Sequence, residues 1–304
     1  MDAEILAFDP EPGLVEALSP NVRRVLAPNP SPMTFRGTNT YLVGTDDICV
    51  IDPGPDMADH NSAILAALEP GQQITHILVT HAHVDHSPLA ARLSRDTGAP
   101  VYGFGDASTG RSPVMQELAA KGLAGGGEGV DAHFAPDHLL KEGDIVQGGG
   151  WSLEAIHTPG HFGNHLSFAM GDACFVGDHV MGWASSLVSP PDGDLTDFMA
   201  SCRKLRSRDW SVFHSGHGAP ITAPSKRLDW LIAHRLGREA EILAALGQGP
   251  ARAYDLACGI YTETPTALMG AATRNVFAHL VDLTGKSIVS PQGELHSEAV
   301  FARL

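Results

Sequence analysis

The chain has 304 residues, of which 43% are hydrophobic, and a formal net charge of −15 at pH 7. This size and composition predict one or two packed domains, and the negative charge disfavours a nucleic-acid-binding surface, which gains most from basic residues. No apolar run approaches the length needed to cross a membrane, and the acidic amino terminus lacks the basic and apolar regions of a signal peptide, so we expect a cytoplasmic protein without membrane association.

Short apolar segments between glycine-rich turns predict strands in the first 225 residues, at 22–27, 40–43, 49–51 and 77–80. Helical patterns are expected at 59–68 and 88–94. Strands and helices mixed in this way indicate an α/β fold, with two facing sheets between outer helices in an αββα sandwich. Residues 111–142 have the least regular pattern and are predicted to form a flap.

The most informative segment is His-Ala-His-Val-Asp-His at residues 81–86, which directly follows a predicted strand. Imidazole nitrogens and carboxylate oxygens are ligands that divalent zinc, iron and manganese accept. A strand followed by a tight loop can aim His81 and His83 at one point. Asp85 and His86 can then face a neighbouring point. A structural role explains a lone pair of histidines but not four ligand-type residues in six positions, so we predict a site for two metal ions.

Further ligands are required, because four residues cannot complete two coordination spheres. Three later segments share one form, a short apolar run that ends in a ligand-type residue beside glycine, which lets the backbone turn sharply. These segments supply His161, Asp178 and His217. We therefore expect the site along one edge of a sheet. The neighbouring histidines are interpreted as packing residues, namely His157, His165, His179 and His214.

With these motifs in view, the chain resembles the metallo-β-lactamase superfamily over residues 20–225, where all five ligand-bearing motifs occur in the family's order. For the first metal, the resemblance implies the ligands His81, His83 and His161. For the second metal, it implies Asp85, His86 and His217, with Asp178 as the bridge. It also implies that Asp52, in Val-Ile-Asp-Pro-Gly, orients the ligand loop. A bridging carboxylate, in place of the cysteine ligand of some antibiotic-destroying members, resembles the hydrolase branches.

The ligand set predicts hydrolysis. Two metal ions about 3.5–4 Å apart can share a water and lower its pKa toward neutrality. The metal-bridging hydroxide would then attack the carbonyl carbon of a small-molecule ester, thioester or lactone. Asp85 lies beside this water and could move a proton, so Asp85 and Asp178 are the candidate catalytic residues. We expect two zinc ions as cofactors, with iron or manganese as alternatives for the same ligands.

From about residue 225 the sequence changes to a helical pattern. A long helix is predicted over 225–246 and a short one over 253–260. A third helix is expected to begin with Thr264 as its N-cap and Pro265 in its first turn, and to run to about residue 283.

Two short strands are predicted after the third helix, at 287–290 and 299–302. Three helices followed by a β-ribbon form the pattern of a winged helix. This tail resembles the C-terminal domain of the lactamase-beta-like branch of the superfamily, whose animal member is a mitochondrial endoribonuclease. We therefore expect a catalytic domain at 1–224 and a small winged-helix domain at 225–304.

Two alternatives to small-molecule hydrolysis remain open. The branch resemblance favours a metal-dependent endoribonuclease for single-stranded RNA, but residues 226–304 hold eight basic and eight acidic residues and no basic run. The other alternative is a non-catalytic metal-binding regulatory protein, which would not require all seven ligands. A small molecule is favoured over RNA as the partner, and the winged helix could cover the site or form a homodimer.

Overall fold

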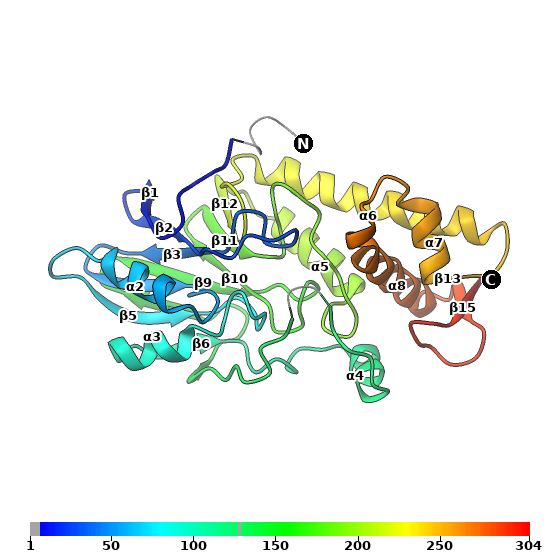
Figure 1. Ribbon diagram of the computed structural model, residues 1–304, viewed down its shortest axis with the longest axis horizontal. Helices are drawn as coiled ribbons and strands as arrows, with labels where there is room; N and C mark the ends of the chain where they lie inside the picture. The colour runs from blue at the N-terminus through cyan, green and yellow to red at the C-terminus, as the bar shows by residue number, and fades with distance from the viewer. Residues whose placement is uncertain (1–6, 127–128) are drawn as a thin grey trace.

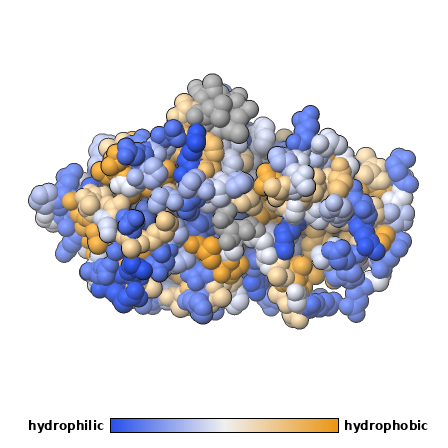
Figure 2. Space-filling view, in the orientation of Figure 1, coloured by the Kyte–Doolittle hydropathy of each residue, from blue (hydrophilic) through white to orange (hydrophobic). Residues whose placement is uncertain are grey.

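The structure, a computed structural model, describes residues 7–126 and 129–304. The expectations for the amino-terminal segment 1–6, and for 127–128 within the predicted flap, lie outside the described residues. Two sheets occupy one half of the molecule, and helices with a small third sheet occupy the other (Figure 1). On the face in Figure 2, hydrophilic side chains spread over both halves. None of the helices in the described ranges is both long and apolar enough to cross a membrane.

The first sheet has seven strands, whose order in space follows their order in the chain. They are β1 (Val15–Ser19), β2 (Val22–Leu26), β3 (Asn39–Val43), β4 (Asp47–Ile51), β5 (Gln73–Leu78), β6 (Val101–Gly103) and β7 (His138–Leu139). Strands β1 to β4 pair antiparallel, whereas β4 to β7 pair in parallel. Three predicted strands match within two residues at each end, and the fourth ends at Leu78 rather than at residue 80.

The second sheet has five strands. In spatial order they are β12 (Val212–Ser215), β11 (Ala173–Gly177), β10 (Leu166–Met170), β9 (Trp151–His157) and β8 (Ile145–Gly148). Neighbours pair antiparallel except β11 and β12, which are parallel. The carboxyl ends of β9, β11 and β12 therefore lie at the same edge of this sheet.

Alternating side chains along the strands build the layers. In β4, Ile48 and Val50 join the core that also contains residues of helices α2 and α3, whereas Cys49 and Ile51 join the core between the sheets. On the other side, β11 sends Val176 to the core shared with α5. Each fully buried aliphatic side chain of this kind contributes about 1.5–3 kcal/mol. The layers are helix, sheet, sheet, helix, as predicted. The helices are α2 (Ala58–Ala66), α3 (Ala90–Thr97) and α5 (Leu195–Arg206).

The C-terminal region packs around a core of its own. Its elements are α6 (Pro224–Leu246), β13 (Ala251–Arg252), α7 (Ala253–Ile260), the 3-10 helix η1 (Thr266–Leu268), α8 (Met269–Gly285), β14 (Val289–Pro291) and β15 (Val300–Arg303). Its sheet has the order β13-β15-β14. Helix α6 joins both halves, because Leu228 belongs to the sandwich core and Ile242 to the C-terminal core. Helix α4 (Pro113–Ala120), within the predicted flap, joins that second core through Met115. The boundary at residues 224 and 225 stays a prediction.

The third C-terminal helix begins later than the sequence predicted. Pro265 has an extended backbone, with φ −55° and ψ 141°, and α8 starts only at Met269, after η1. Its N-cap position is held by Leu268, which provides no side-chain hydrogen bond. Thr264 and Leu268 instead line a cavity. The local capping signal of Thr264 and Pro265 therefore does not set the start of α8.

Candidate metal centre

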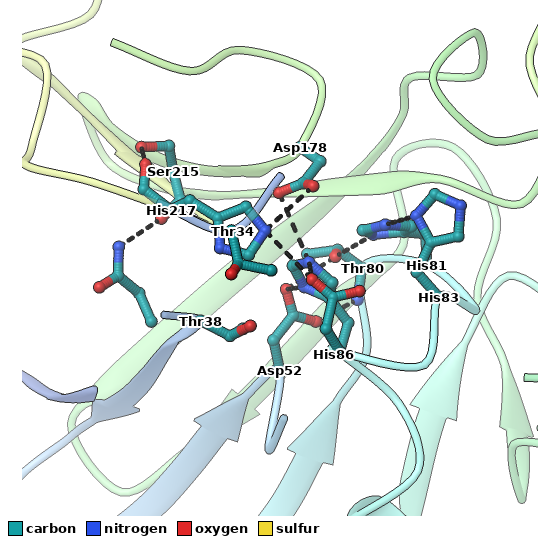
Figure 3. A network of polar contacts seen from close by, with 12 residues as sticks. Thr34, Thr38, Asp52, Thr80, His81, His83, His86, Asp178, Ser215 and His217 are labelled. Carbon is teal, nitrogen blue, oxygen red and sulfur yellow. Dashed lines mark hydrogen bonds and ion pairs between the residues drawn. The ribbon is translucent and has the colours of Figure 1, made fainter. Parts of the chain in front are cut away.

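The seven predicted ligands lie where strands end at the shared edge of the two sheets. Figure 3 labels His81, His83, His86, Asp178 and His217 among them. Residues 81–86 follow β5, His161 lies in the loop after β9, Asp178 follows β11, and His217 follows β12. Because these strands deliver their carboxyl ends to one edge, side chains far apart in sequence meet there. None of the seven exposes more than 6% of its surface. The structure therefore brings all seven residues together in a buried centre.

Three histidines form the first cluster. The Nε2 atom of His81 lies 2.9 Å from Nδ1 of His83, and Nε2 of His161 lies 3.1 Å from the same atom. Three ring nitrogens thus converge on one point. The three histidines that the resemblance implied for the first metal therefore lie together.

Two carboxylates and two histidines form the second cluster. His217 Nε2 lies 3.2 Å from Oδ2 of Asp85 and 3.2 Å from Oδ2 of Asp178. His86 Nε2 lies 3.4 Å from Asp85 Oδ2 and 3.5 Å from Asp178 Oδ1. Asp178 Oδ2 is also 3.8 Å from His161 Nε2 in the first cluster. Asp178 therefore faces both clusters, in the position expected of a bridging ligand.

Hydrogen bonds behind the rings fix their orientation. His161 donates its Nδ1 proton to the carbonyl oxygen of Leu187 at 2.7 Å, and His217 donates its own to that of Gly37 at 3.0 Å. His86 Nδ1 donates to Asp52 Oδ2 at 2.9 Å. Because each Nδ1 atom is engaged by a carbonyl or carboxylate oxygen, the Nε2 atom of each ring faces the centre, as in metal-binding histidines.

Asp52 anchors the start of the ligand loop. Its Oδ1 accepts from the Thr80 backbone N–H at 2.7 Å, and its Oδ2 accepts from the Thr80 hydroxyl at 2.7 Å. The backbone of Asp52 has φ 51°, a left-handed conformation that residues other than glycine rarely adopt. Thr80 directly precedes His81, and His86 donates the third hydrogen bond to this carboxylate. Asp52 therefore positions both ends of the 81–86 motif.

A segment around Gly37 supports the His217 loop. Asn39 Nδ2 donates to the carbonyl oxygens of Ser215 and Gly218, and the Tyr41 hydroxyl donates to Ser215. Gly37 has φ 136°, and a Cβ there would lie 2.1 Å from the Ala27 carbonyl oxygen, so only glycine fits. The sequence displays this segment as Gly-Thr-Asn-Thr-Tyr, but nothing in its pattern shows that Gly37 holds His217 through its carbonyl.

Burial and charge set the protonation states. Burial, helped by the neighbouring imidazole of His161, lowers the pKa of His83 to about 3, so this ring stays neutral. Burial would raise the pKa of Asp178, but His217 and His86 hold it well below its usual range. Burial likewise opposes the charge on His217, yet Asp178 and Asp85 raise its pKa to about 10. The centre thus holds ionised carboxylates that attract positive charge.

The contacts fit metal ions better than they fit hydrogen bonds. Asp85 Oδ1, Asp178 Oδ1 and His86 Nε2 are buried and have no hydrogen-bond partner among the described residues. Within each cluster the ligand atoms lie within 4.8 Å of one another. Unpaired buried polar atoms cost free energy, which a cation in the second cluster would offset. Imidazole and carboxylate donors without a thiolate suit zinc, iron and manganese.

Comparison with known proteins agrees with this geometry. The sequence profile of the metallo-beta-lactamase superfamily matches residues 33–217, a range that contains all seven clustered residues. The chain belongs to the metallo-β-lactamase superfamily. It is thus a superfamily hydrolase, and its two His/Asp clusters are candidates for a binuclear metal site.

Two relatives and one solved structure illustrate the match. The hydrolase is 30% identical to a beta-lactamase-like protein 2 homolog of Caenorhabditis elegans, over 90% of this chain and 88% of that protein. It is 31% identical to an atrochrysone carboxyl ACP thioesterase of Cryptosporiopsis sp., over 77% of this chain and 65% of that protein. A beta-lactamase domain protein from Burkholderia ambifaria shares the fold, with a TM-score of 0.80 and 20% identity over 100% of this chain and 99% of the other.

A cavity of about 220 Å³ adjoins the metal-type clusters of the hydrolase. Its polar side is formed by His83, Asp85, His161, Asp178 and His217. Its remaining walls come from residues 32–33, from the loop at 181–187 and from residues 261–275. The C-terminal region therefore lines the cavity beside the clusters.

A second link connects the C-terminal region to His161. Arg235 of α6 donates through Nη2 to the Ser186 carbonyl oxygen and through Nη1 to Asn275 Oδ1 at 3.0 Å. Asn275 Oδ1 also accepts from the Val188 backbone N–H at 3.0 Å. Leu187 lies between Ser186 and Val188, the two residues held by these hydrogen bonds. Its carbonyl oxygen orients the His161 ring. The sequence did not predict this network, because it depends on backbone groups that every residue has.

Replacing Asn275 with leucine tests this link. The variant removes the acceptor shared by Arg235 and Val188, so the Leu187 carbonyl loses its fixed position behind His161. We expect metal affinity at the first cluster to fall about 10–100-fold, the effect typical of a lost ligand-orienting contact. Metal content after dialysis against graded chelator measures this, and Asn275→Asp, which keeps the oxygen acceptor, is the matched control. Equal metal retention in both variants would show that the network is only structural.

Proposed function

We propose that this hydrolase is binuclear. His81, His83 and His161 hold one metal ion in this proposal, and Asp85, His86 and His217 hold the second. The observation that carries it is the position of Asp178, whose Oδ2 lies 3.2 Å from His217 Nε2 and 3.8 Å from His161 Nε2. Zinc is the proposed metal, and iron or manganese are alternatives for the same donors.

When bound, two such metal ions polarise a substrate carbonyl and lower the pKa of water. The chain's own groups orient the reaction and move its protons. Asp85 Oδ1 is buried and unpaired among the described residues, and Asp85 lines the cavity, so it can accept a proton from the attacking water. The backbone carbonyls behind His161 and His217 hold these rings in one tautomer.

The proposed substrate is an ester, thioester or lactone of a small molecule, whose acyl bond is cleaved by water. A cavity of about 220 Å³ beside the centre suits a small molecule. The formal charge of −15 disfavours a polyanion. Among the three bond types, the thioesterase name of the fungal relative supports the thioester.

Cleavage of single-stranded RNA is the alternative function, and the C-terminal region is the feature that favours it. Its three α-helices precede β14 and β15 as predicted, with the additional short strand β13 between α6 and α7, and we propose residues 225–304 as a winged-helix domain. Its balanced charge, however, offers no basic run for a nucleic acid. A regulatory protein without catalysis is less well supported, because all seven ligand-type side chains are present and clustered. A cytoplasmic location and a homodimer stay predictions.

A two-substrate comparison on purified protein of known metal content tests the proposal. One reaction contains labelled single-stranded RNA, and the other contains a panel of small thioesters, esters and lactones. EDTA-treated protein and the Asp178→Asn variant are the controls in both. We expect turnover of an acyl substrate that both controls abolish, with intact RNA. RNA cleavage that is sensitive to both controls would identify a nuclease instead, and no turnover of either substrate would favour the regulatory protein.

A further inference from the structure

The walls of the cavity differ in character from its metal-facing side. Met33, Met181, Trp183 and Leu187 line it from the sandwich half, and the C-terminal region adds three apolar residues beside the uncharged polar residues Tyr261, Thr264 and Asn275. Among the described residues that line the cavity there is no lysine or arginine. A charged group far from the metal clusters would therefore be buried without a counter-charge, which is costly.

The first turns of α8 present one face to this cavity. Leu268, Ala271, Ala272 and Asn275 all line it, and their spacing of three and four residues places them on the same side of the helix. Two of the four are alanines, so the helix backbone approaches the cavity while leaving its volume open. A larger side chain at position 271 would project into this space.

We propose that the C-terminal region and the loop at 181–187 form a chamber for an uncharged, apolar acyl group, and that Ala271 limits the size of the group that fits. This inference rests on the proposed function, because it assigns the acyl side of the substrate to a defined wall. It also gives the C-terminal region a role in specificity. Each methylene buried in the chamber is expected to raise kcat/KM about fourfold until the chamber is full.

A chain-length series tests the chamber. Acyl thioesters of N-acetylcysteamine, from acetyl to decanoyl, keep the leaving group constant, and a decanoyl analogue with a terminal carboxylate adds charge. The wild type should prefer the longer neutral chains and discriminate against the carboxylate. In Ala271→Leu, the ratio of decanoyl to acetyl kcat/KM should fall at least about 10-fold relative to wild type, because the isobutyl side chain that replaces the methyl group occupies chamber volume.

Gly270→Leu is the matched control. It places the same side chain one residue earlier on α8, where no atom of the described residues lies within 4 Å of a Cβ and the residue is exposed. The chain-length ratio of this variant should equal that of the wild type. A flat chain-length profile in the wild type, or equal changes in the ratio for both variants, would overturn the chamber assignment.

A binding measurement separates this inference from the proposed function. Titration calorimetry with 1-decanol, an uncharged probe with no bond to hydrolyse, reports on the chamber whether or not the protein acts on thioesters. We expect Ala271→Leu to weaken binding at least about 10-fold and Gly270→Leu to leave it unchanged. Binding with this pattern but no hydrolysis would contradict the proposed reaction alone. Hydrolysis without selective loss of decanol binding would contradict the chamber alone.

Discussion

Replacing Asp178 with asparagine is expected to abolish hydrolysis while the fold survives. The carboxylate of Asp178 faces both clusters and is buried, with 6% of the residue exposed. Asparagine keeps the shape of the side chain but removes the negative charge that would bridge two cations. Charge stabilisation by a metal centre contributes several kcal/mol to a transition state, so kcat should fall about a thousandfold or more.

The measurement combines steady-state kinetics, metal analysis and thermal unfolding of the same preparations. Asp172→Asn is the matched control, because Asp172 is exposed in the turn between β10 and β11 and undergoes the same chemical change. We expect normal activity and two metal ions per chain in the control, and reduced metal content with a folded protein in Asp178→Asn. Full activity with normal metal content in Asp178→Asn would exclude a bridging role.

The residues of the centre could be predicted from the sequence because their chemistry lies in their side chains. His81, His83, Asp85 and His86 form a dense motif, and His161, Asp178 and His217 each follow an apolar strand. The sandwich could be predicted for a related reason, since alternation in segments such as β4 reflects burial on two faces. Local sequence patterns were therefore enough to predict the sandwich and to identify the candidate ligands.

Features that depend on contacts between distant segments could not be predicted. The carbonyl oxygens of Gly37 and Leu187 orient His217 and His161. Every residue has a backbone carbonyl, so the sequence does not show which ones accept these hydrogen bonds. Leu268, at the late start of α8, lines the cavity, a placement that the capping signal of Thr264 did not predict. The chamber itself joins segments more than two hundred residues apart.

Replacing Asp52 with alanine is the second change with a large expected effect, because three hydrogen bonds to this carboxylate disappear together. The Thr80 backbone N–H becomes a buried donor without its partner, at a cost of about 1–3 kcal/mol in the free energy of unfolding. Alanine also tolerates the φ of 51° poorly, which adds strain. His86 loses the acceptor that fixes its ring, so metal affinity at the second cluster should fall about 10–100-fold.

Asp52→Asn separates the backbone contribution from that of the carboxylate. Asparagine accepts the left-handed conformation and offers one oxygen, so it can keep the bond from the Thr80 N–H. Its amide cannot accept from His86 and from both Thr80 donors as the carboxylate does. We therefore expect the melting temperature of Asp52→Asn to lie closer to wild type than that of Asp52→Ala, while both variants release metal more readily to a chelator. If Asp52→Asn retained metal as the wild type does, the Asp52 carboxylate would serve the fold of the loop and not the orientation of His86.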